Sequence, residues 1–111
     1  MSLFSVKTPA QLDMLLKQGV DINTQDYLQQ TFLHVLVQNN HWMSQVTMIN
    51  YVLQKGADPN IRNYLGKTPI FYAQSPQVVY TLRYYGAKLY IVDNDGNTAM
   101  KTNTNIRPLN S

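Results

Sequence analysis

The chain has 111 residues, of which 44% are hydrophobic and 14% charged, and it contains no cysteine. This length and composition predict one small domain with a single core, and the lack of cysteine excludes disulfides and thiolate metal sites. The formal net charge is +3, and the excess is spread over residues 56–111 without a clustered basic stripe, which disfavours nucleic acid as a partner.

The first expected helix begins after Thr8, which forms a capping-box pattern with Gln11. Leu12 and Leu15 lie on one helical face, and the helix is expected to run to about Gln18. Gly19 then fits a helix end, where the backbone turns left-handed. We therefore expect residues 8–25 to form an N-terminal capping helix and its exit.

Three connectors in the chain are copies of one another, each with 12 residues from glycine to threonine. They run from Gly19 to Thr31, from Gly56 to Thr68 and from Gly86 to Thr98. Gly66 and Gly96 mark a tight turn inside the second and third copies. The first copy has Gln29 at that place, so its turn must differ or carry strain. Copies of this kind predict a repeat architecture.

A second helix is expected to follow each connector. Thr31 and Thr68 can each cap such a helix through the hydroxyl, and Pro69 fits its first turn. Before the second connector, Ile49 and Leu53 continue the apolar spacing of a helix face. Leu53 should therefore be buried between neighbouring units.

The chain resembles an ankyrin repeat protein. Two sequences carry the resemblance, Gly-Lys-Thr-Pro-Ile-Phe-Tyr-Ala at 66–73 and Gly-Ala-Asp-Pro-Asn at 56–60. Thr31-Phe-Leu-His-Val-Leu is similar to the family's Thr-Pro-Leu-His-x-Ala, with Phe32 and Leu36 departing from it. The resemblance implies an all-α fold, an ankyrin-repeat solenoid of stacked helix pairs joined by β-turn or hairpin connectors. The single domain 1–111 would comprise the capping helix 8–25, repeats 26–62 and 63–92, a C-terminal partial repeat 93–103 and a polar tail 104–111.

The resemblance also implies a function. In this family the turn tips and inner helices form a concave surface that grips a folded protein, so we expect a non-catalytic binding module, an adaptor or an inhibitor such as an immunity protein. Position by position, the contact residues would be Tyr27, Leu28, Gln30, Arg62, Tyr64, Leu65, Lys67, Asn94, Asp95 and Asn97. The two basic residues favour an acidic partner. The alternative is a structural fragment of a longer array without independent binding.

The remaining expectations concern partners and location. Residues 1–7 are too short and too polar for a signal peptide, and no segment approaches the length of a membrane span. We expect a cytoplasmic protein, a monomer or weak homodimer, with no membrane or nucleic-acid partner and no cofactor.

Catalysis is disfavoured by the residues available. His34 and Asp26 could be imagined as a base and its partner, but His34 occupies the family's Thr-x-x-His place, where the ring bonds neighbouring backbone. The equivalent residue in the next unit is Phe71, which fits packing better than proton transfer. With two histidines and no cysteine or glutamate, no metal cluster has a recognisable spacing. We expect no enzymatic activity.

Two groups of aromatic residues have alternative interpretations. Trp42, in the inserted segment 39–44, is either an interface anchor or the first residue of the apolar stripe of the following helix. A second group lies in the last repeat, where its members either form an aromatic contact surface or complete the exposed end of the stack. This group comprises Tyr80, Tyr84, Tyr85 and Tyr90, with Arg83 interrupting the stripe beside them.

Overall fold

The computed structural model describes residues 2–39 and 45–106. Their elements, with η denoting 3-10 helices, are η1 (Leu3–Ser5), α1 (Pro9–Lys17), α2 (Phe32–Gln38), α3 (Gln45–Gln54), η2 (Pro69–Tyr72), α4 (Pro76–Tyr84) and α5 (Ala99–Thr102). Within these ranges there is no strand, only an isolated antiparallel bridge between Val92 and Thr98. The fold is all-α, as predicted.

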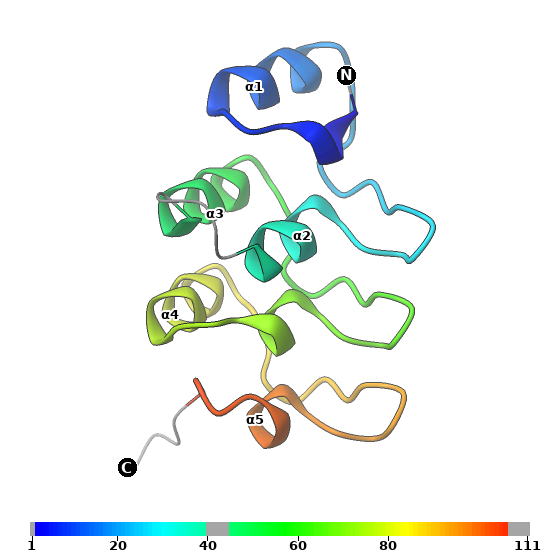
Figure 1. Cartoon of the computed structure of the whole chain (residues 1–111), viewed down its shortest axis with the longest axis vertical. Helices are drawn as coiled ribbons and strands as arrows, with labels where there is room; N and C mark the ends of the chain where they lie inside the picture. Colours follow the sequence, from blue (N-terminus) through cyan, green and yellow to red (C-terminus); the bar gives the residue numbers. More distant parts are fainter. Residues whose placement is uncertain (1, 40–44, 107–111) are drawn as a thin grey trace.

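The elements form a stack of layers along the longest axis of the molecule (Figure 1). Within a layer α2 packs on α3, and between layers α2 packs on η2 and α3 on α4. The outer helices α1, α3 and α4 lie along one side, and the connectors project as loops on the opposite side. The chain is therefore a short solenoid of helical units joined by turn-forming connectors.

The core follows the helical periodicity. Leu12 of α1, Ile49 and Val52 of α3 and Leu82 of α4 are fully buried, and Leu53 is only 4% exposed. The prediction that Leu53 is buried is thus confirmed. Burial of these apolar faces between neighbouring units is the main force that stabilises such a stack.

Neighbouring connectors are joined by asparagine amides. Asn23 accepts from the N–H of Asp58 at 2.8 Å and donates to the carbonyl of Gly56 at 3.3 Å. Asn60 repeats the arrangement one unit later, accepting from Lys88 N–H at 2.9 Å and donating to a carbonyl. Tyr90 stands at the equivalent place of the third connector and has no amide for such a pair. These bonds fix the distance between successive units.

The N-terminal layer contains an element that the sequence did not indicate. The 3-10 helix η1 packs against α2 and buries Leu3, and Val6 follows it into the core. Thr8 caps α1 by accepting from Gln11 N–H at 3.2 Å, as predicted, but the Gln11 side chain accepts from the N–H of Lys7 rather than from Thr8. The capping box therefore forms with its second bond shifted by one residue.

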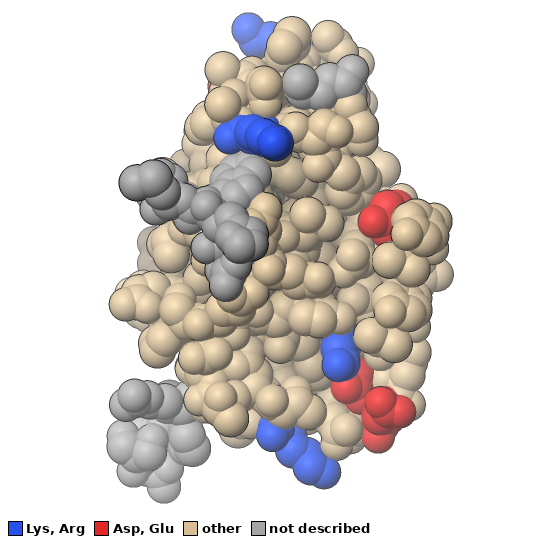
Figure 2. Space-filling view, in the orientation of Figure 1, with Lys and Arg blue, Asp and Glu red and all other residues tan. Residues whose placement is uncertain are grey.

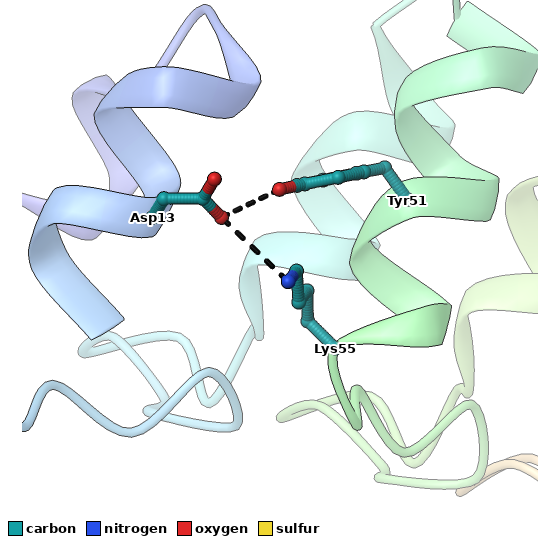
Figure 3. A network of polar contacts seen from close by, with 3 residues as sticks. All are labelled: Asp13, Tyr51 and Lys55. Carbon is teal, nitrogen blue, oxygen red and sulfur yellow. Dashed lines mark hydrogen bonds and ion pairs between the residues drawn. The ribbon is translucent and has the colours of Figure 1, made fainter. Parts of the chain in front are cut away.

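A polar group on the outer side also links α1 to α3 (Figure 3). The Tyr51 hydroxyl donates to Asp13 at 2.5 Å, and the Lys55 ammonium lies 3.9 Å from the same carboxylate oxygen. The hydrogen bond to Asp13, with a smaller effect of burial, raises the pKa of Tyr51. Because the two side chains of the Lys55–Asp13 ion pair are 41% and 45% exposed, the pair adds little to stability.

The C-terminal end is packed further than expected. The Asn103 amide donates to the carbonyls of Ile70 and Ala73, both at 3.0 Å, and so satisfies the end of η2. Ile106, which falls in the expected polar tail, is only 5% exposed. The described part of that tail, residues 104–106, therefore contributes to the fold.

The second inner helix differs from the first. Thr31 caps α2 together with His34 in a capping box, as predicted for the threonine. The prediction that Thr68 caps the next helix is wrong, because its buried hydroxyl has no hydrogen-bond partner. Phe71 stands at the place of His34, and its side chain has no polar atom. The element itself, η2, is a four-residue 3-10 helix rather than an α-helix. A buried hydroxyl without a partner carries a desolvation cost.

This contrast predicts opposite effects for one substitution at two equivalent places. Thr68→Val should leave the free energy of unfolding unchanged or raise it by about 1 kcal/mol, because it removes the unpaired hydroxyl and keeps the shape. Thr31→Val should lower it by about 1–2 kcal/mol, because it removes a working cap. Urea denaturation of the two variants measures both values. Equal losses in the two variants would show that the Thr68 hydroxyl is satisfied in solution.

Candidate functional site

The connector tips are built by one side chain each. In the first tip the Asp26 carboxylate accepts from the N–H groups of Leu28 and Gln30, at 2.9 and 3.0 Å. Asn63 and Asp93 do the same in the second and third tips. Such bonds preset a tight turn. The Asp26 carboxylate therefore stabilises the first turn.

The tips are also bonded to one another. The N–H of Tyr64 donates to the carbonyl of Leu28, and the N–H of Asn94 donates to the carbonyl of Leu65, each at 3.0 Å. The Asn94 amide adds a bond to the carbonyl of Tyr64 at 2.9 Å. The three tips consequently form one continuous edge, which is the side of projecting loops in Figure 1.

The structure places most of the predicted contact residues on this edge. Tyr27 is 91% exposed, Tyr64 50% and Leu65 39%, while Leu28 is half-buried between the first two tips. In the third tip Asn94 and Asp95 are exposed and Asn97 is half-buried. The Gln30 side chain accepts from the Gln38 amide at 2.7 Å and so joins the tip to α2. Their role in binding stays a prediction.

The basic residues of the edge make internal contacts. Arg62 donates to the carbonyls of Gly66 and Val92, both at 3.1 Å, and thereby ties the second tip to the third. The Lys67 ammonium lies 5.8 Å from the centre of the Tyr72 ring. Figure 2 shows basic and acidic groups side by side along this edge, and a broad uncharged area over the middle of the face. Any electrostatic preference at the tips is therefore local.

His34 is a structural residue in the geometry observed. Its Nδ1 accepts from the N–H of Thr31 at 3.1 Å, which leaves Nε2 as the protonated nitrogen, 2.9 Å from the carbonyl of Lys67. The ring thus joins the first inner helix to the second tip. Burial lowers the pKa of His34 from 6.5, against smaller raising effects of the bond to Lys67 and of Asp26. A buried neutral ring with both nitrogens engaged is unsuited to proton transfer.

This lowered pKa predicts a pH dependence of stability. The unfolded chain takes up a proton on His34 near pH 6.5 and the folded chain only at lower pH, so the unfolded state binds more protons between the two values. The free energy of unfolding should therefore decrease as the pH falls below about 6.5 and be independent of His34 above it. Denaturation curves from pH 7.5 to 5 measure this slope, and His34→Phe should flatten it. An unchanged slope in that variant would assign the effect elsewhere.

A second aromatic surface lies on the outer side of α4. Tyr80 and Tyr84 are 71% and 73% exposed, and the Tyr85 ring meets Tyr84 edge to face at 5.2 Å. Tyr80 borders a shallow hollow of about 430 Å³ between α3 and α4, which Val46 also lines. This surface is on the side of the stack away from the tips (Figure 1). Its two interpretations stay open, as do those of Trp42, which lies outside the described residues.

One exposed tip residue is missing from the predicted set. Gln29 lies between Leu28 and Gln30 and has a φ of 61°. Its sequence signal was the absence of the turn glycine, which indicates strain but does not by itself identify a contact residue.

The residues described form no group of three histidine, aspartate, glutamate or cysteine side chains able to hold a metal ion. In the same ranges, every helix is too short or too polar to cross a membrane.

Comparison with known proteins agrees with the geometry. The family model of the ankyrin repeat matches residues 29–64, which contain α2, α3 and the connector that leads to the second tip. No curated protein matches the chain.

Proposed function

Because the chain is an ankyrin repeat protein, and such repeats are protein–protein interaction modules, we propose that it binds a folded partner protein through its turn tips and the adjoining inner helices. The main support is the first two tips, where Tyr27 and Tyr64 are exposed on turns that a main-chain hydrogen bond holds together. Tyrosine provides a large contact area at a small entropy cost, and a rigid turn reduces that cost further. This edge is prepared for binding before a partner arrives.

The proposed activity is steric rather than catalytic. As a small non-catalytic module, the chain would act as an adaptor, or as an inhibitor or immunity protein that covers the site of a toxin or enzyme. Lys67 and Arg62 are the basic residues of the edge, and on this basis we propose a partner whose contact surface is acidic. Lys67→Gln should then slow association mainly at low salt.

Affinity capture tests the proposal. The immobilised chain is exposed to a lysate of its source cells, and retained proteins are identified by mass spectrometry, in parallel with a Tyr64→Ala column. A protein retained by the wild type and lost from the variant supports the proposal. If the wild-type column retains no specific protein, the alternative of a structural unit without independent binding is favoured. Sedimentation of the free chain distinguishes a monomer from a weak homodimer.

A further inference from the structure

The first tip has a backbone conformation that its residue does not favour. Gln29 has a φ of 61°, whereas Gly66 and Gly96 occupy the equivalent places of the other tips, with φ of 77° and 81°. A left-handed conformation costs an ordinary residue about 1–2 kcal/mol and costs glycine little. Strained residues of this kind concentrate at functional sites, where a side chain is needed in one position.

The seam between the second and third tips, where the two turns are in contact, has no room for a side chain at position 66. A Cβ on Gly66 would lie 2.5 Å from Oδ1 of Asn94, 2.8 Å from the main-chain nitrogen of Asn94 and 2.8 Å from Nη2 of Arg62. In the first seam these two neighbours are replaced by Tyr64 and Gln25. A side chain at position 66 would therefore clash with the third tip, whereas the first tip holds a side chain at the equivalent place.

The Gln29 amide is also free within the described chain. Its side chain is exposed, and its main-chain groups form the turn, with the N–H donating to Asp26 and the carbonyl accepting from the Gln25 amide. The side-chain amides of Gln25, Gln30 and Gln38, by contrast, are engaged within the chain. Gln29 thus presents an unpaired donor and acceptor on the tip that carries Tyr27, next to the tip that carries Tyr64.

We propose that Gln29 is a specificity-determining contact residue, whose amide pairs with a main-chain peptide group of the partner between Tyr27 and Tyr64. This inference rests on the proposed function. A primary amide carries both a donor and an acceptor, so it matches the N–H and C=O of an exposed backbone segment without any charge. The turn fixes the point at which the Gln29 side chain leaves the backbone. Tyr27 on the same tip and Tyr64 on the neighbouring tip supply apolar contact area.

Two substitutions separate binding from strain. Gln29→Gly removes the amide and relieves the turn, so the Tm should stay at or above that of the wild type. Gln29→Glu keeps the shape and the strain but replaces the donor by a carboxylate oxygen. The probe is the protein retained by the wild-type column and lost from the Tyr64→Ala column, purified and titrated calorimetrically. Each Gln29 variant should raise the Kd about tenfold, because a peptide group of the probe is left unpaired.

The outcomes distinguish this inference from the function on which it rests. The inference for Gln29 alone is overturned if both Gln29 variants bind the probe with a Kd within about twofold of the wild-type value while Tyr64→Ala binds it more weakly. A wild-type column that retains nothing specific, or only proteins that the Tyr64→Ala column retains equally, overturns the proposed function and this inference with it.

Discussion

Leu53→Ala should lower the free energy of unfolding by about 2–5 kcal/mol. Leu53 is 4% exposed and belongs to the apolar face of α3, which packs against α2 and α4. Truncation removes buried area and leaves a cavity that neighbouring rigid units fill poorly. Because small domains have only about 5–15 kcal/mol of stability, this single change should unfold a substantial part of the population near physiological temperature.

Urea denaturation measures this loss, and Leu65→Ala is the matched control. Leu65 is 39% exposed at a turn tip, so its truncation should change the free energy of unfolding by about 0.5 kcal/mol or less. A loss below about 0.5 kcal/mol for Leu53→Ala as well would contradict the assignment of α3 to the core of the stack.

The burial of Leu53 illustrates what the sequence could predict. Apolar residues at helical spacing, ended by glycine, identified the outer helices, since these depend on contacts between neighbours three or four residues apart. The repeated connectors with their Asn and Asp residues predicted the turns for the same local reason. Family resemblance then supplied the order in which the units stack, which local spacing alone does not define.

Features that depend on distant partners were less predictable. Thr68 does not cap its helix, because in the 3-10 turn of η2 the N–H of Phe71 donates to the Thr68 carbonyl at 3.1 Å and the hydroxyl stays unpaired. The packing of η1 and of Ile106 depends on apolar faces contributed by α2 and by the last unit, which the short polar segments themselves do not reveal. Residues 3–5 were therefore assigned no element, and residues 104–106 were assigned to a polar tail.

The candidate site was predictable in position but not in its internal contacts. Fold resemblance placed Tyr27 and Tyr64 at adjacent tips, and their exposure agrees. It did not indicate that Arg62 donates to two carbonyls, because those acceptors lie in the second and third connectors. Nor did it separate Gln29 from its neighbours, since only the backbone angle shows that this residue adopts the left-handed conformation.

Tyr64→Ala should weaken binding of a protein that the wild-type column retains by about 2 kcal/mol or more, roughly thirtyfold in Kd. The ring is half exposed at the centre of the tip edge, whereas the main-chain bond to Leu28 does not depend on the side chain. The Tm should therefore stay close to that of the wild type. Calorimetric titration and thermal melting of the same preparation measure the two effects independently.

Tyr84→Ala is the matched variant on the opposite side of the stack. Tyr84 is 73% exposed, so its truncation removes a comparable aromatic ring without disturbing the core. If the partner binds the tips, Tyr84→Ala should leave the Kd unchanged within about twofold. The reverse pattern, with Tyr84→Ala abolishing binding and Tyr64→Ala without effect, would place the partner on the outer helices. In that case the exposed tyrosines of α4 would be the contact surface, and the tip edge would serve only to join the units.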